Sequence, residues 1–463
     1  MTWAPMPGDV RAVRRERTRA REMERKGHHG SLMARKVMSS VAIRVVTVGL
    51  LGVSSILTAR ELHPAGRGTY GVVLAFVWVA AALGHLSVEQ SVVLRWQRGD
   101  DPCSIASTAV LIGLLAGCLA GLGGWIIALR VGGGSFSGHD RRLIVIGLPA
   151  VPLVILTGYL MSLHVLGDRL RRVNLIRSAS AAAQLVALVV LIATGHLTTG
   201  SALLVWVLTL GAVPVLLLLP GLAIRPAHVS SALGMRLLRT GIRYHWGMAA
   251  LFMLRRVDTL ILNTQVSRRE VGLYVVAVVL AELLFLPAET VAQAVLPKQV
   301  VGTLVDAADF TARVVRLNTI VGVVCALVLA VLSPVLVRVG YGAAFAGSVA
   351  PLLALLPGVA TVGLIRPITA ILVRLDRPSL VSLVCLVALV VNVALNFALI
   401  PTFGIVGASI ASTVAYACQA VAYAVWLVRS THLTPADLWP RRADLRLLTA
   451  LPRRGLRPAP VVS

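Results

Sequence analysis

The chain is built from apolar runs of roughly twenty residues, separated by short polar breaks. A helix needs about 20 largely apolar residues to cross a bilayer. Backbone groups in lipid must be paired within their own segment, which favours helices, and the alternating pattern of barrel strands is absent. The sequence therefore predicts an all-α polytopic membrane protein with about twelve spans: 37–59, 70–94, 104–129, 143–166, 178–194, 201–224, 244–262, 271–296, 317–337, 343–365, 379–400 and 404–428.

Composition excludes a soluble protein. Hydrophobic residues make up 57% of the 463 residues, charged residues only 14%, and the mean hydropathy is +0.86. A soluble domain carries about 25% charged residues, and a disordered chain has low hydrophobicity. The five cysteines form neither a Cys-x-x-Cys motif nor a cluster with histidine, so we expect no disulfide framework and no metal site.

The net charge of +25 follows the predicted topology. If the N-terminus is cytoplasmic, the cytoplasmic segments hold 32 Lys and Arg residues, the external loops hold 8 and the spans hold 4. Cytoplasmic loops of membrane proteins are enriched in these residues. We therefore expect a multi-pass protein of the cell inner (plasma) membrane, with both termini in the cytoplasm and no nucleic-acid partner.

The longest basic connection divides the predicted spans into two groups of six. We expect a basic cytoplasmic tail, an N-terminal six-helix bundle, a basic cytoplasmic connector, a C-terminal six-helix bundle and a second basic tail, over residues 1–36, 37–224, 225–243, 244–428 and 429–463. The first tail is too long and too charged for the start of a cleavable signal sequence. Met33 is an alternative translation start.

A weak repeat relates the two halves. Residues 60–70 follow the first span and end in Gly68-Thr-Tyr70, and residues 268–274 follow the seventh span and end in Gly272-Leu-Tyr274. Each Gly-x-Tyr opens the next span, and the offset between the two is 204 residues. Two six-helix halves in the same orientation fit a parallel repeat about the membrane normal.

Three stretches resemble one transporter superfamily. They are Ala-Arg-x-Leu-x-Pro-x-Gly-Arg-Gly-x-Tyr over residues 59–70, Arg-Arg-Val-Asp-Thr-Leu-Ile-Leu over 255–262 followed by Val-Gly-Leu-Tyr-Val-Val-Ala over 271–277, and the Asn-to-Ser run over 396–412. With the span layout, they resemble the polysaccharide flippases of the multidrug/oligosaccharidyl-lipid/polysaccharide exporter superfamily over about residues 37–428. His63 stands where that family often has glycine.

The resemblance implies a fold and a function. The fold is two six-helix bundles around a central cavity that works by alternating access. The cargo is a glycan linked to undecaprenyl pyrophosphate, moved from the cytoplasmic to the outer leaflet for surface polysaccharide biosynthesis. Its partners would be the lipid-linked glycan, membrane lipids, and the polymerase and glycosyltransferases of the same process.

Charged residues within a predicted span are candidate site residues, because they are costly unless they face a cavity or pair with one another. Arg255, Arg256 and Asp258 lie in the seventh span, and on a continuous helix Arg255 and Asp258 share a face. The planar guanidinium of arginine can donate two hydrogen bonds to a pyrophosphate. Asp258 would hold this arginine in place when the cavity is empty. The alternative is a structural ion pair between helices.

Three further residues are candidates for transport. Arg44, about two turns into the first span, either reaches the cavity or extends to the cytoplasmic surface. Glu282 and Glu289 lie seven apart in the eighth span and could couple transport to H+ or Na+, or pair with Arg255 or Arg256. His85 and Glu89, four apart in the second span, and Asn392 and Asn396 in the eleventh are interpreted as packing or helix–helix contacts.

Other functions stay open. The chain has no P-loop, no Gly-x-Ser-x-Gly motif and no long soluble stretch, so we expect no enzyme activity and no cofactor. A glycosyl-polymerase or ligase would need a large external loop, and the external loops here are short. A cation-coupled multidrug exporter of the same superfamily and a non-transporting scaffold with this fold are the remaining alternatives.

Overall fold

The computed structural model describes residues 9–131, 138–218, 224–286, 304–375, 377–441 and 444. Within these ranges, most side chains from residue 42 onward are described as well. Every regular element in these ranges is helical. The elements are α1 (Asp9–Gly84), α2 (Val88–Gln97), α3 (Pro102–Val131), α4 (Gly138–Gly147), α5 (Ala150–Leu166), α6 (Leu170–Ala193), α7 (Thr199–Leu218), η1 (Pro226–His228), α8 (Ser231–Met253), α9 (Val257–Gln265), α10 (Arg268–Glu282), α12 (Leu304–Val335), η2 (Leu336–Tyr341), η3 (Ala343–Ser348), α13 (Val349–Ala360), α14 (Val362–Arg374), α15 (Pro378–Ser430) and η4 (Pro435–Asp437).

The predicted all-α membrane fold is confirmed. Eight helices in the described ranges are long and apolar enough to cross a membrane. Two of them, Ala42–Gly84 and Ser379–Ser430, each turn back at a break in helical geometry, at His63 and Gly404, and so supply two predicted spans apiece. The seventh predicted span is itself broken between α8 and α9, and the eighth is described only as far as residue 286.

The turn in α1 explains one detail of the sequence. His63 has φ 56° and ψ 171°, a backbone conformation that residues other than glycine rarely adopt. Pro64 follows at once, and its ring restricts His63 to extended values of ψ. The glycine that the resembling family often has at this position would adopt this φ without a steric clash.

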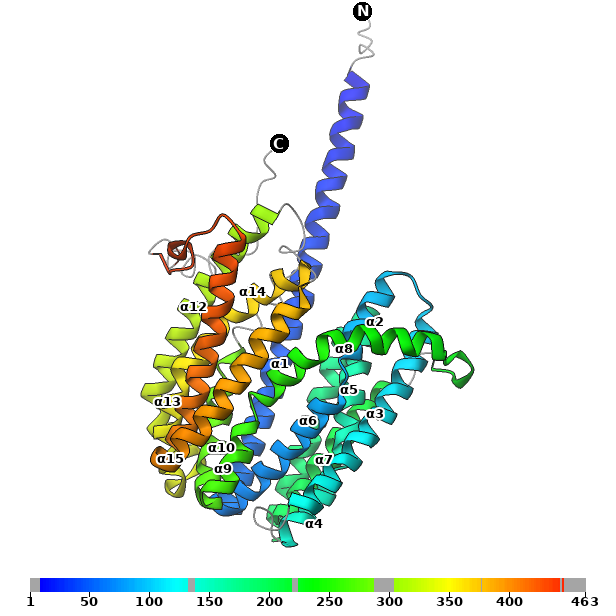
Figure 1. Cartoon of the computed structure of the whole chain (residues 1–463). Helices are drawn as coiled ribbons and strands as arrows, with labels where there is room; N and C mark the ends of the chain where they lie inside the picture. The colour runs from blue at the N-terminus through cyan, green and yellow to red at the C-terminus, as the bar shows by residue number, and fades with distance from the viewer. Residues whose placement is uncertain are drawn as a thin grey trace, which may run out of the picture.

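The helices form two bundles that diverge towards one end (Figure 1). We name α1–α7 the N bundle and α9–α15 the C bundle, and α8 contacts both, packing on α2 and α3 and on α15. One apolar core lies within residues 77–237, and a second is formed by residues 254–438 with Ala59 and Val72 of α1. The bundles diverge at the end where α2 and α14 lie, and we call this the open end.

Part of the predicted connector, residues 225–243, is helical. Residues 225–230 of it lie outside a long helix, and the rest belongs to α8, which begins at Ser231. The Ser230 side chain caps that helix by accepting the Leu233 N–H at 3.3 Å. Leu233 and Leu237 are buried in the N-bundle core, so this basic segment packs as the start of a helix.

The bundles meet at the opposite end through the sequence repeat, and we call this the closed end. A Cβ on Gly68 would overlap the carbonyl oxygen of Arg268, and a Cβ on Gly272 would overlap that of Pro64. These pairs are related by the same offset of 204 residues that separates Gly68 from Gly272 in the sequence. The contact is therefore self-complementary, and each half places the same glycine against the other half.

Polar contacts close the same end. The Arg268 guanidinium on α10 pairs with Asp140 on α4 at 2.6 Å. From α1, Arg60 donates to the carbonyl of Gly340 at 2.6 Å and also to the carbonyl of Val339. These bonds join the N bundle to the C bundle, so separating the bundles at this end requires breaking all of them.

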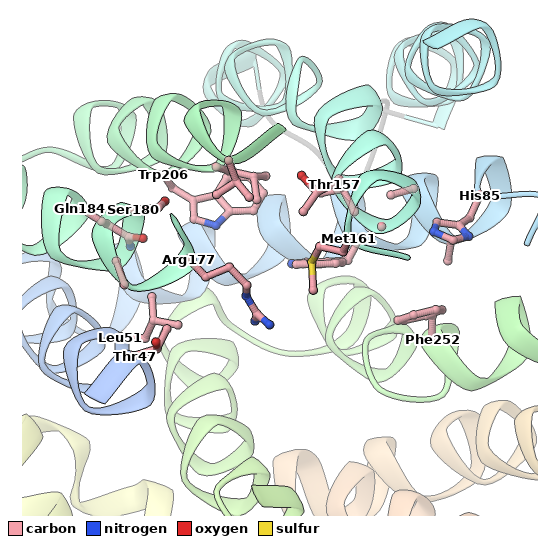
Figure 2. A pocket seen from close by; sticks show the side chains of 18 residues that line it. Thr47, Leu51, His85, Thr157, Met161, Arg177, Ser180, Gln184, Trp206 and Phe252 are labelled. Carbon is pink, nitrogen blue, oxygen red and sulfur yellow. The ribbon is translucent and has the colours of Figure 1, made fainter. Parts of the chain in front are cut away.

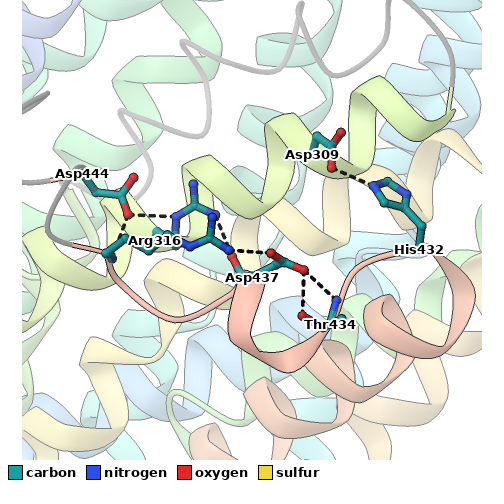
Figure 3. A network of polar contacts seen from close by, with 7 residues as sticks. Asp309, Arg316, His432, Thr434, Asp437 and Asp444 are labelled. Carbon is teal, nitrogen blue, oxygen red and sulfur yellow. Dashed lines mark hydrogen bonds and ion pairs between the residues drawn. The ribbon is translucent and has the colours of Figure 1, made fainter.

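At the open end, the segment after α15 is held on α12 (Figure 3). Arg316 donates to the Asp444 carboxylate at 2.9 Å and to the Asp437 carbonyl at 2.7 Å. Burial raises the pKa of Asp444, but hydrogen bonds from Arg441 and Arg316 outweigh it and hold that pKa below its usual value. The half-buried Asp437 carboxyl has a lowered pKa because Thr434 donates to it twice.

We expect the contacts of Arg316 with Asp437 and Asp444 to break in acid. A carboxyl with a lowered pKa stabilises the folded contact above its unfolded pKa of about 3.9, and that contribution is lost as the pH falls through its lower folded value.

We expect Arg316→Ala to free residues 433–441 at neutral pH, measured as faster amide hydrogen exchange by mass spectrometry. Arg313→Ala, an exposed arginine on the same helix, is the control and should leave exchange unchanged. Slow exchange in Arg316→Ala would contradict this role.

Candidate functional site

One candidate site is a cavity of about 370 Å³ in the N bundle (Figure 2). Its walls come from α1, α5, α6 and α7, with Phe252 added from α8. It is lined by Thr47, Leu51, Trp78, Ala81, Ala82, His85, Val154, Thr157, Gly158, Met161, Arg177, Ser180, Ala181, Gln184, Trp206, Leu210, Val213 and Phe252. Its size falls in the range of small-molecule pockets.

The polar groups of this cavity are few, and three of them lie on one helix. Arg177, Ser180 and Gln184 follow one another at helical spacing along α6, and Figure 2 shows the Arg177 guanidinium extending between the helices. Trp78 and Trp206 supply aromatic faces. No aspartate or glutamate is among the described residues that line the cavity, so its one formal charge at neutral pH is positive.

Sequence reasoning missed Arg177. The prediction began the fifth span at residue 178, which left Arg177 in a loop with other arginines. In the structure α6 begins at Leu170, about two turns earlier, and this places Arg177 within the helix. The signal that could have found it is the polar series at spacings of three and four that continues to Gln184.

Arg44 lies beside this cavity without lining it. It is partly buried on α1, one turn before the cavity residue Thr47. Thr47 is fixed against α6, because its hydroxyl lies 2.5 Å from that of Ser178. Arg44 therefore stays a proposed substrate contact at the edge of the bundle.

The three candidates of the seventh span lie at a break in the helix. α8 ends at Met253 and α9 begins at Val257, so Arg255 and Asp258 do not share the face of one continuous helix. The Arg255 guanidinium lies over the ring of Phe285, 4.3 Å from its centroid. Arg256 pairs with Glu282 of α10 at 3.1 Å, which is the ion pair that the sequence left as an alternative for this glutamate.

Asp258 belongs to a buried hydrogen-bond cluster. It is 3% exposed and accepts bonds from the Tyr274 hydroxyl and from the Ser412 hydroxyl at 3.2 Å. Ser412 in turn accepts from the Asn392 amide at 3.2 Å, and the Asn396 amide donates to Asn392 at 3.1 Å. Asn392 thus makes the interhelical bond predicted from the sequence.

Little free space adjoins this cluster. The pocket between Arg255, Asp258, Glu282 and Tyr416 has a volume of about 20 Å³, which holds one water molecule but no diphosphate. The structure therefore separates the candidates into two places. Arg177 and its neighbours line a ligand-sized cavity, and Arg255, Arg256, Asp258 and Glu282 form a packed polar region in the C bundle. Glu289 lies outside the described residues.

The buried hydrogen bonds of Asp258 should contribute to the stability of the protein. We expect Asp258→Ala to lower the free energy of unfolding by roughly 1–3 kcal/mol, because the Tyr274 and Ser412 hydroxyls lose their buried acceptor. Thr264→Ala on the same helix is the control, since it removes only a hydroxyl that donates back to Ile261 within α9. Thermal unfolding in detergent measures both, and equal losses in the two variants would contradict a special role for Asp258.

Comparison with known proteins supports the fold. No protein-family profile matches the sequence, and no curated protein matches it either. Among solved structures, an inward-facing multidrug resistance MATE family transporter of the MOP superfamily matches with a TM-score of 0.67 at 12% identity, over 84% of this chain and 98% of that one. The lipid II flippase MurJ in an inward closed conformation matches with a TM-score of 0.65 at 15% identity, over 87% and 89%.

A third match is the MATE transporter VcmN of Vibrio cholerae in a bent form, with a TM-score of 0.57 at 11% identity, over 86% of this chain and 98% of that one. The chain therefore has the fold shared by MATE transporters and MurJ, as the resemblance implied. These neighbours are transporters and not enzymes. At such low identity the likeness extends to the fold, and the cargo must be argued from the cavity.

Proposed function

We propose that this protein is a flippase that moves a lipid-diphosphate-linked oligosaccharide from the cytoplasmic to the outer leaflet by alternating access. The observation that carries the proposal is the N-bundle cavity, where Arg177 is accompanied by Gln184 and by the faces of Trp78 and Trp206. An arginine fork bonds two phosphate oxygens at once. Aromatic faces and side-chain amides are suited to the apolar faces and hydroxyls of sugars.

The direction of transport follows from the topology. We place the open end and both termini in the cytoplasm of a cell with a glycan-bearing envelope, because the basic segments gather in the connections assigned to that side. The glycine contact and the Arg268–Asp140 pair then close the external side. A cargo headgroup would enter from the inner leaflet and leave after these contacts separate.

A cation-coupled drug exporter is the second candidate, and the MATE neighbours favour it. A cationic drug needs a negative or purely aromatic site. The described lining of the cavity has no carboxylate and carries Arg177, so its charge favours an anionic cargo. Asp258 and Glu282 are engaged elsewhere, by Tyr274 and Arg256.

Deletion of the gene tests the proposal. We expect the lipid-linked intermediate to accumulate in the inner leaflet while surface glycan falls, and mass spectrometry of that lipid would identify the cargo. Glycosyltransferases and a polymerase would be its partners in the same process. Unchanged glycans together with altered drug sensitivity would favour the exporter, and no change in either would favour a scaffold.

A further inference from the structure

The second predicted span is broken where the N bundle meets α8. α1 ends at Gly84 and α2 begins at Val88, and between them Leu86 has φ 49° and Ser87 has φ 48°. Left-handed backbone costs about 1–2 kcal/mol for each residue with a side chain, and it persists only where the surroundings impose it. Here α8 packs closely against the turn, since a Cβ on Gly241 would lie 2.5 Å from the Leu86 carbonyl oxygen.

Three titratable side chains gather at this break. The Nδ1 of His85 lies 3.1 Å from Oε2 of Glu89, with the side chains 13% and 14% exposed. His245 of α8 is 4% exposed and lies within electrostatic reach of His85 and Glu89, and its ring is hydrogen-bonded to the Leu83 backbone. Tyr159 of α5 packs edge-on against His85, with ring centroids 5.1 Å apart, and donates its hydroxyl to the His85 carbonyl.

Three polar atoms of these side chains lack a hydrogen-bond partner among the described residues. The Nδ1 atoms of His85 and His245 and Oε2 of Glu89 are buried without a hydrogen-bond partner there. The short approach of His85 to Glu89 is therefore an ion-pair distance without hydrogen-bond geometry. With both imidazoles neutral and the carboxylate ionised, the cluster has a charge of −1, and one added proton makes it neutral. Burial of an uncompensated charge is costly.

We propose that His85, Glu89 and His245 form a proton-binding site whose occupancy sets how α8 packs against the N bundle. A proton is the ligand that fits this set, because imidazole nitrogen binds protons at physiological pH whereas hard metal cations prefer oxygen ligands. The proposal rests on the transport function given above and adds a coupling ion and its place. That place differs from Glu282, which pairs with Arg256.

The proposed proton site lies beside both the N-bundle cavity and α8. His85 lines the N-bundle cavity together with Phe252 of α8, and their ring centroids are 6.4 Å apart. On the other side of the break, the Ser91 hydroxyl of α2 donates to the Leu237 carbonyl of α8 at 2.7 Å. Because α8 also packs on α15, a change of charge here acts on the contact between the bundles.

Histidine NMR tests the proton site directly. Full-length protein with ¹⁵N-labelled histidine is titrated in lipid nanodiscs, and the signals are assigned with His85→Gln and His245→Gln. We expect the two histidines to titrate as a coupled pair, and Glu89→Gln to move both midpoints to lower pH by about one unit, a tenfold loss of proton affinity. Glu270→Gln, in the capping box of α10, is the control and should leave both midpoints unchanged. Midpoints insensitive to Glu89→Gln would overturn the proposal.

A distance measurement tests the link to α8. Spin labels on the exposed native cysteines Cys118 of α3 and Cys418 of α15 report the separation of the bundles, with the other cysteines replaced by serine. We expect the distance distribution to shift between about pH 5.5 and about pH 8, on either side of the ordinary histidine pKa. The Glu89→Gln, His245→Gln double variant should abolish the shift, and a shift equal to that of the parent would overturn the link.

Neither measurement uses a cargo. Their failure would remove the proton site and leave the flippase proposal to be decided by the envelope analysis. A coupled titration in a protein whose deletion leaves every glycan unchanged would instead keep the proton site and remove the glycan cargo.

Discussion

Arg177→Ala is expected to lower glycan export at least tenfold while the protein remains in the membrane. Arg177 is the one fully ionised side chain among the described residues that line the cavity. Charge-assisted hydrogen bonds from arginine contribute about 1.5–3 kcal/mol, and the lower part of this range applies because Arg177 is solvent-accessible. Surface glycan in a deletion strain carrying the variant measures the effect.

The control for this prediction lies on the same helix. Arg171 is exposed on α6 and does not line the cavity, so Arg171→Ala should retain normal export at the same expression level. Arg177→Lys should recover only part of the activity, because an ammonium does not form the paired bonds of a guanidinium. Full export in Arg177→Ala would remove the cavity from the proposed mechanism.

Gly272→Ala is expected to disrupt the closed end of the molecule. The added Cβ would overlap the Pro64 carbonyl oxygen, and backbone on both sides must move to make room. Overpacking of this kind costs about 1–3 kcal/mol, so we expect a lower midpoint of thermal unfolding together with loss of export. Gly68→Ala should have the same effect, because the sequence repeat places Gly68 against the Arg268 carbonyl as it places Gly272 against that of Pro64.

A glycine in open space is the matched control. Gly49 of α1 has no atom within 4 Å of the position of a Cβ, so Gly49→Ala should be neutral or slightly stabilising through helix propensity. If Gly272→Ala unfolds at the parental temperature and exports normally, the glycine crossing has no role in closing this end.

The sequence predicted the fold well because membrane spans follow from hydropathy. The predicted apolar segments are largely helical where they are described, although the second and seventh are each interrupted by a short break. The turn at His63 lies between the first two predicted segments, and the turn at Gly404 lies at the first residue of the twelfth. The repeat of Gly68 and Gly272 was also visible, although its meaning was not. That the two glycines touch each other is a property of three-dimensional symmetry, which an offset of 204 residues does not reveal by itself.

The candidate site was harder to predict, for two physical reasons. Charge within a span identifies residues that must be compensated, and a cavity is one form of compensation among several. Arg256 and Asp258 are instead compensated by Glu282 and Tyr274. Arg177 was missed for the opposite reason, because helices can extend beyond the apolar window that defines a span. Hydropathy alone cannot tell a loop arginine from one on an extended helix.

The central claim is that the protein moves a lipid-linked glycan across the bilayer, and transbilayer movement in proteoliposomes tests it most directly. The lipid that accumulates in the deletion strain is reconstituted with the purified full-length protein, and its exposure on the outside is followed with a lectin that cannot cross the membrane. We expect exposure to increase over time with the parent protein and with Arg171→Ala, and to stay near the level of protein-free vesicles with Arg177→Ala. Exposure at the protein-free level with the parent protein would contradict the account.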